Sequence, residues 1–356
     1  MSSEKTKKVI IALSGGVDSS VAAALLKEGG FNVRGVHIKM WSDPSIPCTT
    51  KEDRYDAMRV AAALNIPFET WDFTEEYRAT VVDYMIREYS IGRTPNPDVM
   101  CNREIKFGVF LKQALNEGAD FIATGHYART SKTAGNTYEL MEAVDKNKDQ
   151  SYFLWTLTQN ELSRTMFPIG EYLKPEVRSL ARKFNLPTAE KKESQGLCFI
   201  GKIDVREFLK TRITENRGKV LTTSGKIVGE HEGLEFYTIG QRHGIGIGGG
   251  TAYYVTEKDF SSNTLVVAEG NLNEKLYKTS LQASQINWIS GMAPNANAPI
   301  EARIRYRQPR QTCRIESING ERLNIIFSTP QRAVAAGQSI VFYLRGCCLG
   351  GAVIDS

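Results

Sequence analysis

The sequence contains no apolar run that approaches the ~20 residues needed to cross a bilayer. Its first residues, MSSEKTKKVIIALSGG, pass from a short polar tail into an apolar run, without a secretory core or an arginine-rich presequence. We therefore expect a cytoplasmic protein that does not associate with membranes. The sequence also lacks internal repeats and low-complexity segments, which excludes a repeat array.

Metal-ligand spacing is missing as well. The six cysteines include no C-x-x-C pair, and the four histidines show no metal-ligand pattern, so no zinc ribbon is expected. The net charge is only +5, which permits a nucleic-acid partner but does not require one. With 356 residues the chain is too long for one ordinary core, and we expect two or three domains.

Strand-like and helix-like segments alternate in the first part of the chain. The apolar run Val9–Ser14 predicts a strand buried on both faces, and Val17–Gly30 predicts a helix that two glycines stop. Further strands are expected over 32–40, 67–73 and 120–129, and further helices over 54–66, 77–90, 105–118 and 174–187. This alternation predicts an α/β domain over 1–213, with a doubly wound, parallel, Rossmann-like sheet.

Near residue 214 the pattern changes to short strands and glycine-rich turns. The segment Asp259–Val267, DFSSNTLVV, predicts a hairpin. From about Leu281 another strand-rich segment runs to the end of the sequence. We expect two smaller β-rich domains, a central one over 214–277 and a β-barrel-like one over 278–356.

The segment Ser14–Ser20, SGGVDSS, lies between the first expected strand and the first expected helix. Glycines there let a phosphate approach the backbone, and the helix N-terminus supplies N–H groups and positive potential. The segment is not a Walker loop, which would end in Gly-Lys-Ser/Thr and whose lysine serves the γ-phosphate. It therefore favours a loop that holds pyrophosphate as a leaving group, with Asp18 helping to hold Mg²⁺. The alternative is a tight turn capped by serine, without a ligand.

The segment Tyr89–Gly108, YSIGRTPNPDVMCNREIKFG, surrounds Cys101 with two prolines, an acid and the basic pair Arg103 and Lys106. Prolines fix the backbone, and Asp98, three residues before the thiol, is placed to assist proton transfer. From these residues alone, an inert cysteine at the start of a helix is the alternative.

The segment SGGVDSS is the signature of the PP-loop ATP pyrophosphatases, and the chain resembles one family among them nearly end to end. That family is the tRNA-specific 2-thiouridylases (MnmA). The resemblance rests on segments from all three expected domains: SGGVDSS, GRTPNPDVMCNREIKFG, ATGHYAR, DKNKDQSYFLW, SQGLCFIGK, TIGQRHGIGIGG, RIRYRQ and GQSIVFY.

The resemblance implies ATP-dependent 2-thiolation of the wobble uridine of tRNA. ATP would adenylate the base oxygen so that AMP leaves, and a cysteine persulfide would supply the sulfur. The family pattern makes Cys101 the nucleophile and Cys198 the persulfide carrier, able to form a disulfide, with Asp98 assisting. It also implies a protein that donates persulfide sulfur, and we expect a monomer. The N-terminus disfavours a mitochondrial location.

The resemblance assigns binding residues position by position. The nucleotide site would consist of Ala12, Leu13, Ser14, Gly15, Gly16, Val17, Asp18, Ser19, Ile38 and Gly125. The tRNA site would consist of Asn96, Pro97, Asp98, His126, Lys148, Asp149, Gln150, Arg305, Tyr306 and Gln338. From spacing alone, Arg303, Arg305 and Arg307 alternate as on one positive face of a strand, which suits phosphate contacts.

Two other functions stay open from the sequence. Another PP-loop ligase that forms carbon–nitrogen bonds would need an ammonia or amino-acid site and no pair of thiols. A non-catalytic tRNA-binding protein would need neither ATP nor the cysteines. Mass spectrometry of tRNA nucleosides, with and without the gene, distinguishes all three.

Overall fold

The computed structural model describes residues 6–43, 50–192, 205–248, 251–295 and 299–356. Cys48 and Cys198 lie outside these described residues. Along the part of the chain that is described, no helix is both long enough and apolar enough to cross a membrane.

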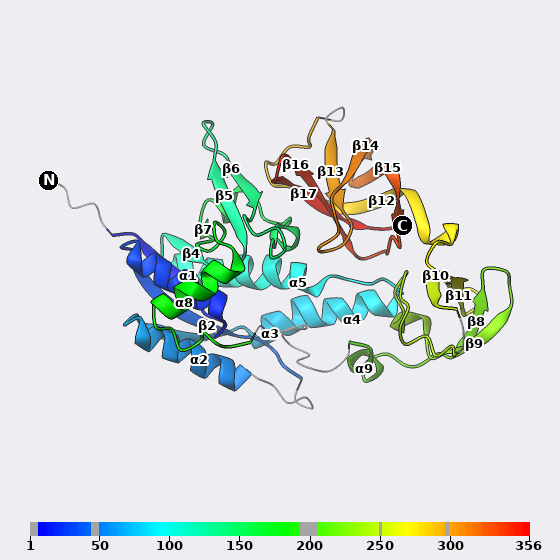
Figure 1. The fold of residues 1–356 in the computed structure, drawn as a ribbon, viewed down its shortest axis with the longest axis horizontal. Helices are drawn as coiled ribbons and strands as arrows, with labels where there is room; N and C mark the ends of the chain where they lie inside the picture. Colours follow the sequence, from blue (N-terminus) through cyan, green and yellow to red (C-terminus); the bar gives the residue numbers. More distant parts are fainter. Residues whose placement is uncertain (1–5, 44–49, 193–204, 249–250, 296–298) are drawn as a thin grey trace.

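A five-stranded parallel sheet forms the centre of the first domain, as expected (Figure 1). Its strand order is β3-β2-β1-β4-β7. The strands are β1 (Lys8–Ala12), β2 (Asn32–Lys39), β3 (Phe68–Asp72), β4 (Phe121–Ala123) and β7 (Thr165–Met166). The alternation of the chain between strands and helices on both faces confirms the doubly wound α/β prediction.

Helices cover both faces of this sheet because successive residues of each strand point to opposite sides. On one face, Val9 and Ile11 pack against α1 (Val17–Glu28), α2 (Thr50–Ala63) and α8 (Lys174–Lys183). On the other face, Ile10, Val36 and Ile38 pack against two longer helical segments. Those segments consist of α3 (Thr74–Tyr77), η1 (Arg78–Val82) and α4 (Asp83–Ser90), and of α5 (Pro97–Met100), η2 (Cys101–Val109) and α6 (Phe110–Asn116).

Both of these helical segments contain a π-helical stretch, η1 in the first and η2 in the second. In η2 the carbonyl oxygen of Arg103 would lie 2.8 Å from a Cβ atom at Gly108, five residues later. Glycine at that position therefore permits the wide π turn. Such turns are rare and concentrate at functional sites.

The strand expected over 120–129 does not exist as one element. β4 ends at Ala123, and a second strand, β5 (Ala128–Lys132), begins in a different sheet. The prediction was wrong because the apolar pattern on both sides hides the turn at 124–127. This turn carries Gly125 and His126.

The central domain is a four-stranded sheet with the order β10-β11-β8-β9. Its strands are β8 (Gly218–Thr222), β9 (Ile227–His231), β10 (Tyr253–Asp259) and β11 (Thr264–Glu269). The expected hairpin is confirmed, since β10 and β11 pair antiparallel around the turn after Asp259. Two short helical segments, α9 (Val205–Lys210) and η4 (Leu234–Phe236), accompany the sheet.

The last domain is a closed β-barrel. Six strands follow the order β12-β15-β14-β13-β16-β17, and β12 also pairs with β17 to close the ring. They are β12 (Tyr277–Trp288), β13 (Ile300–Arg303), β14 (Gln311–Asn319), β15 (Arg322–Arg332), β16 (Ser339–Leu344) and β17 (Cys347–Ile354), preceded by η5 (Glu274–Leu276). Closure leaves no strand edge within the ring.

A hairpin of the first domain joins the barrel sheet from outside. It is formed by β5 and β6 (Tyr138–Glu142), and β6 pairs with β17 through Leu140 and Met141. Two short helices, η3 (Ser151–Phe153) and α7 (Gln159–Leu162), then lead back to the α/β sheet. The hairpin therefore belongs to one domain in sequence and extends the sheet of another.

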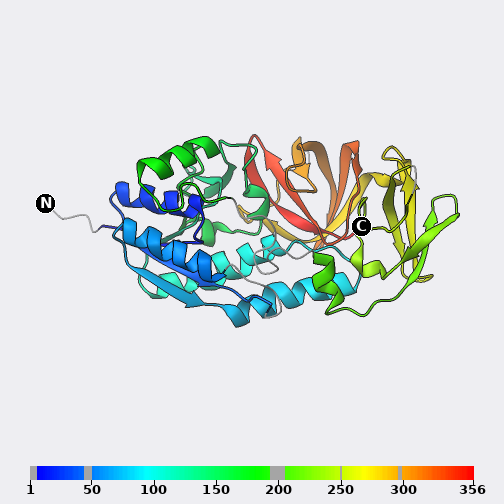
Figure 2. The same ribbon diagram turned by 60° about the horizontal axis from the view of Figure 1, so that its bottom comes forward.

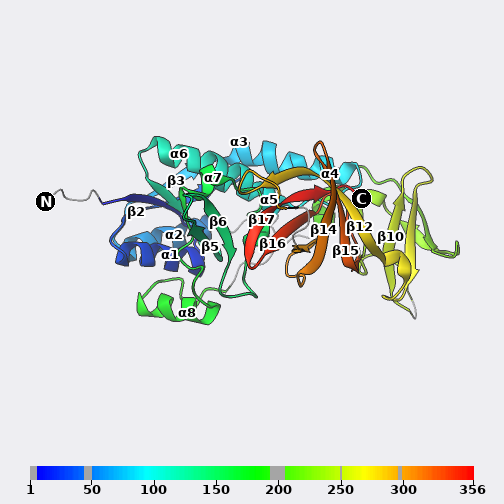
Figure 3. The same ribbon diagram turned by 90° about the horizontal axis from the view of Figure 1, so that it is seen from above.

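The barrel lies between the other two domains, although it comes last in the sequence (Figures 2 and 3). Helix α4 extends from the α/β domain toward the central domain. At its end, Lys258 of β10 donates hydrogen bonds to the carbonyl oxygens of Gly92 and Tyr237. The three domains therefore contact one another in all pairs.

The expected positive strand face of Arg303, Arg305 and Arg307 is wrong. β13 ends at Arg303, and Arg307 lies in a turn with a φ of 63°. Arg303 is half-buried, and its guanidinium donates to Asp149 at 3.2 Å and to Glu142 at 3.1 Å. The two carboxylates come from the first domain, and spacing within one segment cannot show such distant partners.

We predict that Arg303→Ala destabilises the protein by about 3–5 kcal/mol, because the buried carboxylate of Asp149 loses its cation and that of Glu142 keeps only Lys146 and Arg310. Urea unfolding measures the change. Arg314→Ala on the neighbouring strand β14 is the control, since Arg314 is exposed and should change stability by less than about 0.5 kcal/mol. Equal stability of the two variants would contradict this role of Arg303.

Candidate functional site

The loop after β1 has the geometry of an anion site. Gly15 has a φ of 76°, and the carbonyl oxygen of Asp53 leaves no room for a side chain there. The Ser14 and Ser19 hydroxyls lie 3.1 Å apart, and Ser14 N donates to Ser19 Oγ at 3.2 Å. Helix α1 begins after Gly16 without a side-chain cap, so the serine-capped turn is not observed. A helix start of this kind offers its N–H groups to a phosphate.

The turn after β4 lies directly against this loop. A Cβ atom at Gly125 would stand 2.6 Å from Ser19 N and 2.9 Å from the carbonyl carbon of Asp18. Glycine therefore lets the two backbones touch. Ile38 lies near the carboxyl end of β2, beside β1, and is almost fully buried. The structure thus brings Ile38, Gly125 and the loop to one edge of the sheet, as expected for a nucleotide site.

Asp18 is already engaged by two side chains. Lys174 Nζ donates to its two carboxylate oxygens at 2.7 and 2.9 Å, and the Tyr127 hydroxyl donates at 2.9 Å. Among the residues whose placement is described, no three His, Cys, Asp or Glu side chains cluster as metal ligands. A single carboxylate is enough to hold Mg²⁺ only when phosphate oxygens of the substrate supply further ligands. Lys174 and Tyr127 were not anticipated from the sequence, because no local pattern links them to the loop.

The segment before Cys101 is fixed as the prolines indicated. Asn96 caps α5 by accepting a hydrogen bond from Val99 N at 3.3 Å, and Pro97 occupies the first helical position. Asp98 follows on an exposed position, and Cys101 is 5% exposed at the start of η2. The thiol and the acid are therefore one helical turn apart.

Lys106 connects this helix to the turn after β4. Its Nζ lies 3.5 Å from His126 Nε2, and His126 Nδ1 lies 2.7 Å from Thr124 Oγ1. Burial, followed by the charge of Lys106, holds the pKa of His126 well below its ordinary value, so the ring is neutral. Desolvation by the surrounding protein atoms raises the pKa of the Asp98 carboxyl. The positive charge of Lys106 acts in the opposite direction and lowers it.

The barrel holds the loop that precedes Asp98. Gln338 Nε2 donates to the carbonyl oxygens of Thr94 at 2.8 Å and Pro95 at 3.1 Å. Thr94 N donates to Ala336 O at 2.8 Å, and the Thr94 hydroxyl lies 3.0 Å from that of Thr238 in the central domain. In this structure, Gln338 therefore contacts the chain itself at the position where a tRNA contact was expected.

Arg305 and Tyr306 lie near the same helix. The Tyr306 ring is 4.4 Å from the Phe153 ring, and Asn102, next to Cys101, donates to Phe153 O at 3.1 Å. Arg305 donates to Ile239 O at 3.1 Å and to Ala333 O at 2.7 Å, which ties the central domain to the barrel. Both residues are half-buried rather than presented on an open strand.

The three residues of the KDQ segment differ in their surroundings. Asp149 is buried and accepts hydrogen bonds from Ala143 N at 3.0 Å and Ser151 Oγ at 2.9 Å. Gln150 accepts a hydrogen bond from Tyr127 N at 2.9 Å. Lys148 is half-buried in the turn between them and β6. Gln150 thus holds the turn that carries His126, whereas Asp149 fixes the segment that follows β6.

The described cysteines other than Cys101 are poor nucleophiles. Burial raises the pKa of Cys313 to about 12 and that of Cys347 to about 11, and it raises the pKa of Cys348 well above its ordinary value. Cys313, Cys347 and Cys348 are free thiols. Because Cys198 lies outside the described residues, its pairing with Cys101 stays a prediction.

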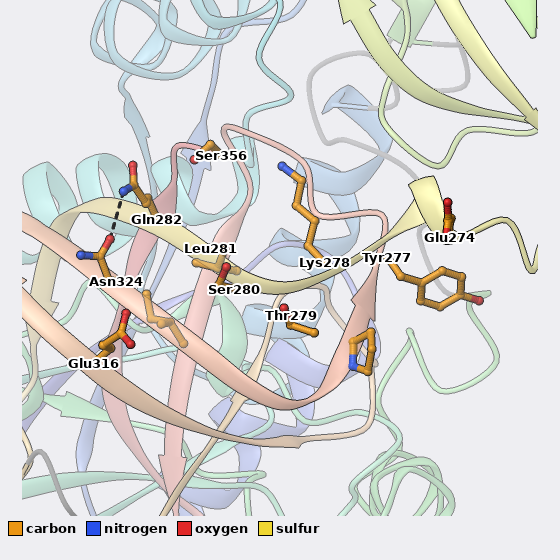
Figure 4. A pocket seen from close by; sticks show the side chains of 12 residues that line it. Glu274, Tyr277, Lys278, Thr279, Ser280, Leu281, Gln282, Glu316, Asn324 and Ser356 are labelled. Carbon is orange, nitrogen blue, oxygen red and sulfur yellow. Dashed lines mark hydrogen bonds between the residues drawn. The ribbon is translucent and has the colours of Figure 1, made fainter. Parts of the chain in front are cut away.

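A hollow of about 1180 Å³ on the barrel lies apart from these residues (Figure 4). Its lining comes mainly from β12 and β15, and on its wall Gln282 donates to its cross-strand neighbour Asn324 at 3.0 Å. Glu274, Glu316 and Lys278 also line it, and neither a thiol nor a histidine does. None of the residues expected in the nucleotide or tRNA site lines it, so this hollow is separate from the candidate site.

Comparison with known proteins agrees with the three-domain structure. Three protein-family models match the chain: "tRNA methyl transferase HUP domain" over 7–202, "tRNA methyl transferase PRC-barrel domain" over 206–269, and "Aminomethyltransferase beta-barrel domain" over 278–354. The chain is 48% identical to the tRNA-specific 2-thiouridylase MnmA of Cupriavidus metallidurans, over 98% of this chain and 99% of that protein.

Other bacterial proteins show the same likeness. The MnmA proteins of Francisella tularensis subsp. holarctica and Streptococcus mutans are 44% and 45% identical, and each comparison spans at least 97% of both chains. The chain belongs to the tRNA-specific 2-thiouridylase MnmA family. The HUP domain of this family implies that the protein uses ATP.

We predict that Gly125→Ala weakens ATP binding at least tenfold, because the new Cβ would displace the backbone of Ser19 in the loop. Equilibrium binding of ATP measures the loss, and thermal unfolding reports whether the fold persists. Gly135→Ala is the control, because a Cβ there meets only Thr133 Oγ1 at 3.8 Å. Unchanged ATP affinity in Gly125→Ala would remove this turn from the nucleotide site.

Proposed function

We propose that this protein is a sulfurtransferase that uses ATP to convert the wobble uridine of tRNA to 2-thiouridine. One observation carries the proposal beyond family membership. Gly125 touches the phosphate loop, and the next residue, His126, approaches Lys106 on the helix of Cys101. Two consecutive residues therefore join the nucleotide site to the thiol and acid that the chemistry needs.

The reaction must first make the uridine oxygen a leaving group. Loss of the N3 proton to Asp98 makes the base oxygen nucleophilic, and its attack on the α-phosphate of ATP releases pyrophosphate. The raised pKa of Asp98 suits a group that takes this proton and later returns it. The uncapped start of α1 would hold the pyrophosphate. We also propose Mg²⁺ in this site, held by Asp18 together with phosphate oxygens.

Sulfur transfer then needs two thiols. The terminal sulfur of a persulfide on Cys198 forms the bond to C2, and AMP departs with the oxygen. The Cys101 thiolate attacks Cys198 Sγ, and the electron pair of the broken S–S bond passes to the thiouridine sulfur. The product disulfide between Cys101 and Cys198 is reduced by a dithiol reductant.

The tRNA would approach the face where Asn96, Pro97 and Asp98 meet the barrel. In this proposal Arg305, Tyr306 and Gln338 act mainly by holding that face in place, since the polar groups of Arg305 and Gln338 already contact the chain and the Tyr306 ring packs on Phe153. In this proposal Lys148 and the exposed Arg307 contact tRNA phosphates. We further propose that the protein works in the cytoplasm as a monomer and receives sulfur from a persulfide-bearing protein.

Methyl transfer, which two matching family descriptions name, is the second candidate. It would need neither adenylation of the base nor a pair of thiols. A carbon–nitrogen ligase and a non-catalytic tRNA-binding protein likewise have no need of Cys101. Mass spectrometry of the modified nucleoside distinguishes sulfur replacing oxygen from an added methyl or amino group, and from no change.

We predict that Cys198→Ser loses both the persulfide and all thiolation. Cys101→Ser should still accept sulfur at Cys198 yet form no thiouridine over many turnovers, because the S–S bond cannot be broken. Persulfide labelling and nucleoside mass spectrometry measure the two steps separately. Cys347→Ser is the control and should thiolate tRNA normally. Wild-type turnover by Cys101→Ser would contradict the two-thiol mechanism.

We also predict that the rate of AMP formation falls with decreasing pH as Asp98 becomes protonated. Its folded pKa lies above the ordinary carboxyl value, and the charge of Lys106 lowers it. Lys106→Met removes that charge, so the pKa should rise and the acid limb of the rate profile should move to higher pH. Lys112→Met, on an exposed position of α6, should leave the limb in place. An unmoved limb in Lys106→Met would exclude Asp98 as the titrating base.

A further inference from the structure

The phosphate loop of this protein contains no lysine, but a lysine reaches it from elsewhere in the chain. Lys174, the first residue of α8, lies 156 residues beyond Asp18. Its ammonium contacts both carboxylate oxygens of Asp18, which stands in the first turn of α1. Lys174 therefore supplies a positive charge beside the phosphate loop, which contains no lysine of its own.

The surroundings of Lys174 restrict where its ammonium can go. The Lys174 side chain is 12% exposed and that of Asp18 33% exposed, so the pair is only partly screened by water. Lys174 Nζ also lies 5.7 Å from the centre of the Tyr127 ring, whose hydroxyl donates to the same carboxylate. Movement of the ammonium is thus limited to the neighbourhood of the loop.

The backbone of Lys174 is fixed on both sides. Leu173 N donates to the Glu176 carboxylate at 2.6 Å, and Lys174 N donates to Asp145 Oδ2 at 2.9 Å. Pro175 follows at a helix position that suits its ring. These contacts hold the base of the side chain while its four-carbon stem can rotate.

We propose that Lys174 is the phosphate-binding cation of the nucleotide site. An anion at the start of α1 lies beside the carboxylate of Asp18, which repels it unless a cation is shared. A lysine ammonium has three N–H donors and binds phosphate as a point charge. Lys174 therefore turns from Asp18 toward the phosphate when nucleotide binds, and this in turn releases Asp18 for a metal ion. The proposal rests on the use of ATP in the proposed function.

A purely structural pairing of α8 with α1 is the competing explanation, and the chain contains a matched control for it. Lys183, at the other end of α8, forms an ion pair with Glu28 of α1 at 3.6 Å. This pair joins the same two helices but lies at the ends away from the phosphate loop. If ion pairing of the helices were the whole role of Lys174, both lysines would behave alike.

The test is calorimetric binding of inorganic pyrophosphate to the full-length protein, without metal. Lys174→Met should raise the dissociation constant about ten- to a hundredfold, as for the loss of one charge-assisted hydrogen bond. Lys174→Arg should keep most of the affinity, and Lys183→Met should match the wild type. An unchanged dissociation constant in Lys174→Met, together with a lowered melting temperature, would overturn the proposal and leave a structural pair.

A measurement on the wild type covers the case in which Lys174→Met does not fold. Acetylation of Lys174 by acetic anhydride, followed by peptide mass spectrometry, should decrease when pyrophosphate is added, while acetylation of Lys183 stays constant. Unchanged or increased labelling of Lys174 would overturn the proposal. Thiouridine formation by the wild type is scored separately, so failure of this inference is distinct from failure of the proposed function.

Discussion

The pairing of Arg303 with two buried carboxylates is the interaction on which the relation between the domains depends. Glu142 and Asp149 are 1% and 0% exposed in their side chains, and Arg303 of the barrel lies between them. Burying three charges is costly unless each is compensated, so this arrangement tolerates little displacement. Since Glu142 ends the β5–β6 hairpin, the ion pairs fix that hairpin against the barrel. The hairpin in turn begins two residues after His126.

The site consists of parts that are distant in sequence and meet at one short turn. Gly125 allows the backbone of the turn to touch the phosphate loop, and His126 places a neutral ring beside Lys106. A neutral His126 lets Lys106 act on Asp98 without a second cation nearby. The loop after β1 and the Cys101 helix are therefore positioned by a common element, as the proposed adenylation and sulfur transfer on one base require.

Local patterns in the sequence predicted much of this architecture. The strands of the α/β sheet, the β10–β11 hairpin and the proline-fixed segment before Cys101 follow from periodicity and from residues with restricted backbones. The break of the 120–129 strand, the π-helix at Cys101 and the ion pairs of Arg303 do not. The break and the ion pairs each depend on a partner far along the chain: Ser19 against Gly125, and Glu142 against Arg303. Alternating arginines look the same in sequence whether they face phosphates or buried carboxylates.

The loop at Thr94 is held by residues near the end of the chain, so it can form only late in protein synthesis. The loop receives its hydrogen bonds from Gln338, 244 residues later, while neighbouring Arg93 binds Asp355, almost at the end of the sequence. A chain emerging from the ribosome can complete its parallel sheet long before those residues appear. The arrangement of Asn96 and Asp98 is therefore among the last to form. A nascent or truncated chain with an intact nucleotide loop would not yet hold its acid and thiol in place, which separates ATP binding in time from competence to modify RNA.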